Sequence, residues 1–199
     1  MNRIPAAVLL AATLLACPSL AQAQSNKHDD TARGGFLVQT DLEFGGDEIA
    51  TVAFTNGDDQ SIYAGQGISL GIGGWFRPVE SSQFQIQGVL GYKYAMTAAS
   101  NADINVSRVV MKLNGVYPFA DGWFVGAGIT HHSSPELNGD GFFEDIAFDD
   151  ATGFSAELGW KWVALRYTKI EYSSEFYEDV DASSIGLSLT WRFGGRSGY

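Results

Sequence analysis

The sequence predicts an all-β protein, an eight-stranded antiparallel up-and-down β-barrel that crosses a membrane. The clearest observation is the segment 184–193, in which large apolar residues alternate with small, polar or charged residues. One face holds Ile185, Leu187, Leu189, Trp191 and Phe193, and the other holds Ser184, Gly186, Ser188, Thr190 and Arg192. Such alternation is typical of a strand with two different faces. The segment is about as long as a tilted strand that crosses a bilayer, and its final aromatic residues suit a membrane–water interface.

Other segments alternate in the same way and complete the predicted barrel. They span residues 35–44, 67–77, 83–95, 104–117, 123–133, 152–162 and 164–174. The connections between them are alternately short and long, as in outer-membrane barrels with short periplasmic turns and longer outer loops. The long connections are 45–65, 96–103, 134–150 and 175–182. Asn56-Gly57 in the first of these predicts a protruding hairpin.

A soluble eight-stranded barrel of the lipocalin type is the alternative fold, because its strands also alternate. In that fold the apolar face lines a cavity and the polar face meets water. Here Trp and Tyr gather at strand ends on the apolar face, and Gly, Ser and Thr populate the opposite face. A crowded interior of small residues with an aromatic girdle outside favours the membrane barrel.

The N-terminus predicts a secretory signal peptide over residues 1–23. A basic start is followed by an apolar run and by the small-residue cleavage site Ala21-Gln22-Ala23. A second interpretation is a lipoprotein box that ends at Cys17. Residues 24–33 are polar and predict a periplasmic tail, which leaves 34–199 for the barrel and its loops. We expect such a chain in the cell outer membrane of a Gram-negative envelope.

The acidic residues are unevenly distributed and predict an acidic crown of outer loops. The net charge of −11 argues against nucleic acid as a partner. Most of the carboxylates fall in the long connections: Asp47, Glu48, Asp58, Asp59, Asp103, Glu136, Asp140, Glu144, Asp145, Asp149, Asp150, Glu175, Glu178, Asp179 and Asp181. A solvated rim is the simplest interpretation of this crown.

One part of the crown resembles the first half of a calcium-binding loop. Glu136, Asn138 and Asp140 supply alternating oxygen ligands before Gly141. Ala147 stands where the acidic ligand is expected after that glycine, so the match is partial. The sequence therefore predicts no cofactor beyond weak binding of Ca²⁺ or Mg²⁺ at the acidic rim, shared with lipopolysaccharide phosphates.

Charged residues on the polar faces of the strands are predicted to point into the barrel. They are Asp41, Glu43, Arg77, Lys93, Arg108, Lys112, Glu157, Lys161, Arg166 and Arg192. An eight-stranded barrel has room for side chains but scarcely for a water channel, and buried charges must pair. We therefore expect a salt-bridge network that fills the barrel, and a narrow pore for small solutes is the alternative.

His131 and Ser133 share one strand face where the segment 123–133 leaves the membrane. A Ser–His hydrolase can use this spacing. The pair resembles the His-x-Ser-Asn motif of the PagL-type lipid A deacylases, which are also eight-stranded outer-membrane barrels. The resemblance implies a lipid A hydrolase. However, no Asn follows either serine, and the candidate acid Glu157 is expected on the opposite face.

The chain as a whole resembles the small outer-membrane β-barrel, porin-like families, of the same build as the OmpX, OmpW and OmpA membrane domains. The resemblance rests on the signal peptide, the alternating segments, the aromatic girdles and the closing Thr190-Trp191-Arg192-Phe193. It implies a non-enzymatic structural or surface-interaction role. The implied partners are outer-membrane lipid, lipopolysaccharide and the barrel assembly machinery. Such barrels usually end at the final aromatic residue, whereas residues 194–199 follow Phe193 here.

Overall fold

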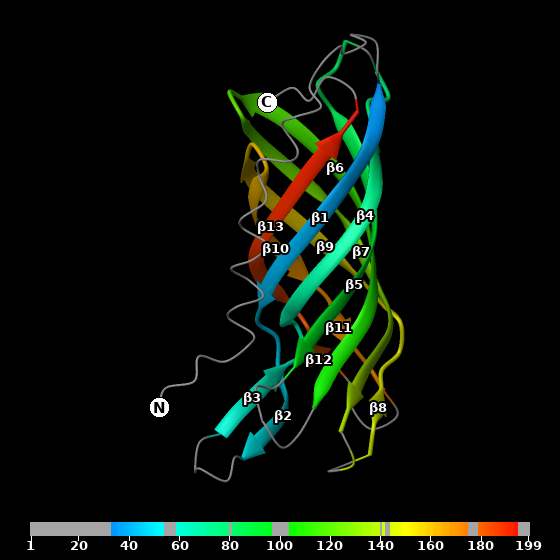
Figure 1. The fold of residues 1–199 in the computed structure, drawn as a ribbon, viewed down its shortest axis with the longest axis vertical. Coiled ribbons are helices and arrows are strands. Elements are labelled where there is room, and N and C mark those ends of the chain that lie inside the picture. Colours follow the sequence, from blue (N-terminus) through cyan, green and yellow to red (C-terminus); the bar gives the residue numbers. More distant parts are fainter. Residues whose placement is uncertain are drawn as a thin grey trace.

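The computed structural model describes residues 33–53, 59–79, 81–96, 104–139, 141, 144–174 and 179–194, so the predicted signal peptide lies outside them. Eight strands form a closed antiparallel barrel, as the sequence predicts (Figure 1). They are β1 (Gly34–Phe44), β4 (Gly67–Phe76), β5 (Gln85–Met96), β6 (Asn105–Ala120), β7 (Trp123–Asn138), β9 (Ala151–Trp160), β10 (Val163–Lys169) and β13 (Ser184–Phe193). β1 pairs with β13, from Phe36 opposite Phe193 to Phe44 opposite Ile185, and this pairing closes the sheet.

The alternation in the sequence decides which side chains face outward. In β13, Ile185 and Leu187 are 52% and 49% exposed on the outer wall, while Ser184 and Ser188 are buried inside. Large apolar residues of the other strands cover the same outer surface: Phe36, Phe44, Leu70, Ile72, Leu90, Leu113, Val125, Ile129, Phe154, Leu158, Leu165 and Tyr167. Within the described ranges, no helix is long and apolar enough to cross a membrane.

Tight turns join the strands at one end of the barrel. Asp121-Gly122 connects β6 to β7, and Lys161-Trp162 connects β9 to β10. The Lys161 backbone has a φ of 56°, and its N–H donates to the Gly122 carbonyl at 2.6 Å. The prediction that Lys161 points into the barrel is wrong, because β9 ends at Trp160 and Lys161 leaves the sheet in the turn. Its side chain is exposed, with the ammonium nitrogen 4.3 Å from the centroid of the Trp160 ring.

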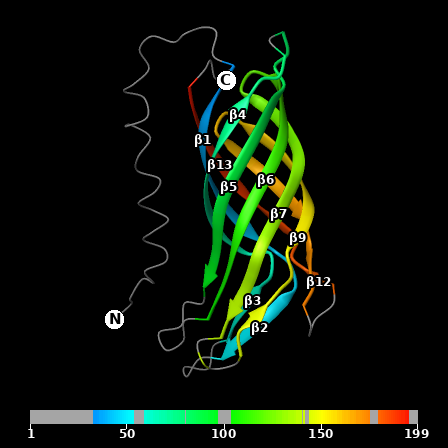
Figure 2. The same cartoon turned by 90° about the vertical axis from the view of Figure 1, so that its right-hand side faces the viewer.

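Short hairpins stand at the opposite end of the barrel (Figures 1 and 2). β2 (Glu48–Ala53) pairs with β3 (Asp59–Tyr63), and β11 (Glu171–Tyr172) pairs with β12 (Val180–Asp181). The first of these is the hairpin that the sequence predicts, although its Asn56-Gly57 turn lies outside the described residues.

Two strand ends differ from the prediction. β7 continues into the expected loop 134–150 as far as Asn138, where it pairs with β8 (Ile146–Ala147). This extension is stable because Leu137 turns into an apolar cluster and is 1% exposed. β10 ends at Lys169 rather than at 174, and the chain continues as the separate strand β11.

Apolar clusters lie toward both ends of the barrel interior. The outer cluster, at the end with the hairpins, consists of Ile62, Ala64, Ile104, Val106, Leu137, Phe148, Ala151, Ile170, Tyr172, Val180 and Ala182. Toward the turns there are two smaller clusters, one of Leu37, Trp75 and Val89 and one of Val116, Phe124 and Ala164. The charged residues of the interior lie between these apolar layers.

Candidate functional site

The interior charges are paired between strands that are far apart in the sequence. Asp41 of β1 lies 2.5 Å from Lys112 Nζ of β6 and 3.7 Å from Arg166 Nη1 of β10. Ser69 Oγ donates to the same carboxylate at 2.6 Å. The Asp41 and Arg166 side chains are at most 2% exposed, so these charges stabilise one another away from water.

Glu157 of β9 forms the second carboxylate site of the interior. Arg166 Nε and Nη2 donate to Glu157 Oε2 at 3.2 and 2.6 Å. Gln39 accepts from Lys112 and from Arg166, both at 3.3 Å, and thereby links the two sites. Gly126 provides the space for Glu157, since a Cβ at this position would lie 2.6 Å from Glu157 Oε1.

The third carboxylate, Glu43, lies closer to the hairpins. Lys93 Nζ is 2.9 Å from Glu43 Oε2, and Ser184 Oγ donates to Glu43 Oε1 at 3.0 Å. Lys93 Nζ also donates to the Gly65 carbonyl at 2.6 Å. Arg108 Nη2 donates to the neighbouring Gln66 carbonyl at 2.9 Å. Two interior cations therefore hold the β3–β4 connection against the mouth of the barrel.

The remaining predicted interior residues lie near the turns. Arg77 and Arg192 are only half-buried. Their guanidinium carbons lie 5.9 Å from the Trp75 ring centroid and 5.6 Å from the Phe124 ring centroid, respectively. Both arginines thus lie over inner aromatic side chains at the turn end.

The sequence-based site omitted several polar residues that complete the network. Gln39, Ser69 and Ser184 share the inward parity of the charged residues on their strands, and this parity is the signal that identifies them. The buried contact between His132 Nδ1 and the Tyr172 hydroxyl, at 2.5 Å, was also missed. That contact depends on how β11 folds over the barrel mouth, for which the sequence carries no local signal.

His131 and Ser133 meet Asp150 at the exposed rim of the barrel. Ser133 Oγ donates to Asp150 Oδ2 at 2.9 Å, and the Ser134 backbone N–H donates to Oδ1 at 2.8 Å. His131 Nε2 is 3.7 Å from Asp150 Oδ2, and His131 Nδ1 is 2.8 Å from Thr152 Oγ1. Asp150 therefore takes the serine hydrogen bond that a Ser–His hydrolase would direct to histidine.

The same donors perturb the Asp150 carboxyl group. The Ser134 backbone N–H and then the Ser133 hydroxyl hold the pKa of Asp150 below its usual value of 3.8. Both hydrogen bonds favour the ionised carboxylate. Asp150 is accordingly an anion that organises the rim rather than a proton donor at neutral pH.

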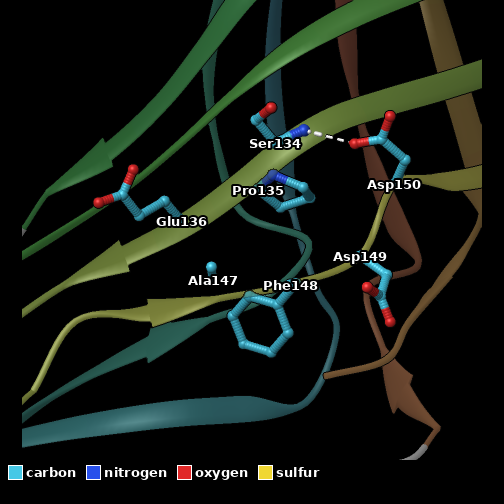
Figure 3. A pocket seen from close by; sticks show the side chains of 7 residues that line it. All are labelled: Ser134, Pro135, Glu136, Ala147, Phe148, Asp149 and Asp150. Carbon is cyan, nitrogen blue, oxygen red and sulfur yellow. Dashed lines mark hydrogen bonds between the residues drawn. The ribbon is translucent and has the colours of Figure 1, made fainter. Parts of the chain in front are cut away.

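A pocket of about 370 Å³ lies beside this rim contact. It is lined by Ser134, Pro135, Glu136, Ala147, Phe148, Asp149 and Asp150. The carboxylates of Glu136, Asp149 and Asp150 point away from one another (Figure 3). Among the described residues, no group of three or more His, Cys, Asp or Glu side chains is placed to hold a metal ion. Asn138 is half-buried and Asp140 lies outside the described residues, so the calcium-loop hypothesis stays a prediction.

The wall and the interior together define the class of protein. A closed barrel satisfies its backbone hydrogen bonds within the sheet, as hydrocarbon surroundings require. The apolar outer face suits lipid, and the paired charges occupy the interior. The protein is a small closed eight-stranded β-barrel of the transmembrane type.

Among solved structures, the chain is similar to the attachment invasion locus protein Ail of Yersinia pestis. The crystal structure of Ail has a TM-score of 0.45 and 7% sequence identity, covering 80% of this chain and 99% of that chain. Ail in complex with the heparin analogue sucrose octasulfate has a TM-score of 0.39 and 8% identity, with coverage of 80% and 99%. The backbone structure of Ail in a phospholipid bilayer nanodisc has a TM-score of 0.39 and 9% identity, again with coverage of 80% and 99%. No protein-family profile and no curated protein sequence matches the chain.

Proposed function

We propose that the protein is a sealed, non-enzymatic barrel whose outer hairpins form an acidic surface for binding a partner. The outer cluster carries this proposal, because it joins the hairpins and the barrel wall in one buried core. Ile62 of β3, Tyr172 of β11 and Val180 of β12 pack there together with Leu137 of β7. These side chains are at most 8% exposed. Shared burial of this kind holds the connections in one arrangement.

The charge on the hairpin end favours a partner with a basic surface. Exposed carboxylates of the described connections are Asp47, Glu48, Glu136, Glu144, Asp145, Asp149, Asp150, Glu171 and Asp179. In this part of the described chain, Lys169 is the exposed basic residue. Such an excess of one charge steers oppositely charged partners and repels the anionic lipopolysaccharide leaflet unless divalent cations intervene.

The filled interior favours a sealed barrel over the narrow pore. Arg166, Lys112 and Asp41 occupy the middle of the barrel and are bonded to one another or to a shared partner. Above them, Tyr172 and Ile62 of the outer cluster are at most 2% exposed. A solute would have to displace both layers, and breaking a buried ion pair costs about 3–5 kcal/mol.

The rim geometry supports the non-enzymatic interpretation over the lipid A hydrolase. Ser133 donates to Asp150, and His131 contacts Thr152, so among the described residues no histidine accepts the serine proton. A nucleophilic serine needs a histidine that accepts its proton.

A charge-selective binding experiment tests the proposal. The barrel in lipid nanodiscs should bind an oligolysine peptide but not an oligoglutamate peptide, and the affinity should fall as salt is added. The triple variant Glu136→Gln, Glu144→Gln, Asp179→Asn removes exposed charge from the hairpin end and should bind oligolysine more weakly. Asp121→Asn is the matched control, because Asp121 is an exposed carboxylate in a turn at the other end of the barrel. Equal binding by the triple variant and this control would contradict the proposal.

A further inference from the structure

The buried charges of the barrel interior do not cancel. Four cationic side chains, Lys93, Arg108, Lys112 and Arg166, are buried among the described residues. The buried carboxylates are Asp41 and Glu43, and the Glu157 side chain is 6% exposed. Among these buried side chains of the described residues, four cations therefore face three carboxylates, an excess of one positive charge.

Each of the three carboxylates is already paired with another cation. Lys93 lies 2.9 Å from Glu43, and Lys112 lies 2.5 Å from Asp41. Arg166 lies 2.6 Å from Glu157 and 3.7 Å from Asp41. In the described part of the chain, Arg108 has no carboxylate within 4.0 Å. Arg108 is therefore the buried cation whose charge no carboxylate of the described residues balances.

The surroundings of Arg108 compensate only a part of its charge. The side chain is 1% exposed, and Nη2 donates to the Gln66 carbonyl. Nε and Nη1 are buried and have no hydrogen-bond partner among the described residues. The guanidinium carbon lies 5.9 Å from the centroid of the Tyr172 ring, which is a weak cation–π contact.

Tyr172 cannot act as the counter-ion. Burial raises the pKa of its hydroxyl to about 12, so the phenol is neutral at physiological pH. The hydroxyl is also engaged with His132 Nδ1 at 2.5 Å. A buried cation without a counter-charge is strongly unfavourable in a low-dielectric interior.

We propose that Arg108 binds one small monovalent anion of the halide class, enclosed between the charged layer and the outer cluster. The anion balances the excess buried charge and accepts from the Nε–H and Nη1–H groups of Arg108, which have no hydrogen-bond partner among the described residues. Lys93 donates to the Gly65 carbonyl, and Arg108 donates to the Gln66 carbonyl. These two hydrogen bonds hold the β3–β4 connection next to the Arg108 guanidinium. The anion is captured when this connection folds over the barrel mouth. This site is independent of any partner at the acidic hairpins.

Bromide provides a direct probe of the site. Crystals of the full barrel grown in sodium bromide should give an anomalous peak within hydrogen-bonding distance of Arg108 Nε or Nη1. In solution, the thermal unfolding temperature should rise as bromide replaces gluconate at constant ionic strength, because an anion that binds only the folded state stabilises it. Gluconate serves as the anion that is too large to be enclosed.

Two single variants distinguish the stabilisation by an anion bound at Arg108 from a general stabilisation by salt. Arg108→Met keeps much of the side-chain length without the charge, and it should lose both the anomalous peak and the bromide-dependent shift. Lys169→Met removes an exposed cation and should keep both effects. If Arg108→Met does not fold, the wild-type bromide crystals still decide the question. Wild-type crystals without a peak at Arg108, or an unfolding temperature equally insensitive to bromide and gluconate, would overturn the proposal in favour of enclosed water.

Discussion

Glu43 Oε2 lies 2.9 Å from Lys93 Nζ, with side chains that are 5% and 1% exposed. Lys169 Nζ and Glu171 Oε1 lie at the same distance of 2.9 Å, but their side chains are 59% and 54% exposed. The two ion pairs share their geometry and differ in burial. Burial, rather than distance, therefore decides how much each pair contributes to the barrel.

Glu43→Gln should destabilise the folded barrel by roughly 3–5 kcal/mol, because it leaves the Lys93 ammonium buried without its counter-charge. Glu171→Gln is the matched control and should leave stability nearly unchanged, since water already solvates both partners. Urea unfolding in lipid vesicles, followed by tryptophan fluorescence, measures both changes. The double variant Glu43→Gln, Lys93→Met should recover much of the loss. Equal losses for the two single variants would show that burial of the first pair has no energetic consequence.

The wild-type barrel should show no steady open state in planar lipid bilayers. The charged layer around Asp41 and Arg166 fills its middle, and the outer cluster covers its mouth. Tyr172→Ala should remain closed as well, because it truncates one side chain of the outer cluster and leaves the charged layer intact. A stable ohmic conductance of the wild-type protein would support the narrow pore and contradict the sealed barrel.

Ser133→Ala should leave the acylation of lipid A unchanged. The Ser133 hydroxyl donates to Asp150 at 2.9 Å and therefore is not activated by His131. Mass spectrometry of lipid A from cells that express the wild type or the variant measures the outcome. Loss of an acyl chain in the wild-type strain alone would restore the hydrolase hypothesis.

Ser133→Ala should also raise the pKa of Asp150 toward 3.8, since it removes one of the donors that stabilise the carboxylate. Ser134→Gly is the control, because it keeps the backbone N–H and suits the positive φ of 50° at that position. Carboxyl carbon NMR titration measures the pKa in each variant. The lowered pKa stabilises the folded rim above pH 3.8, and this contribution is lost as the pH falls through the pKa of the folded state. An unchanged pKa in Ser133→Ala would mean that the rim contact is absent in solution.

Local sequence pattern and tertiary arrangement decide different features of the barrel. The alternation in 184–193 predicts both the strand and its inward face, and Ser184 and Ser188 are buried as that pattern requires. Lys161 departs from its pattern because the chain turns at that residue. When the last residues of an alternating segment form a turn, the apolar–polar alternation can continue through them. The alternation therefore does not show where the strand ends.

The sequence by itself determined the strand class, the closed eight-stranded barrel and the membrane-facing surface, because alternation with a period of two is a property of neighbouring residues. Only the tertiary structure decided that Asp41 pairs with Lys112 and Arg166 and that Ser133 bonds to Asp150. It also decided that Arg108 has no carboxylate partner among the described residues. The even or odd position of a residue in its strand predicts whether its side chain points inward. It does not predict which side chain it contacts across the barrel. That choice depends on register, on side-chain length and on the hairpins that fold over the mouth.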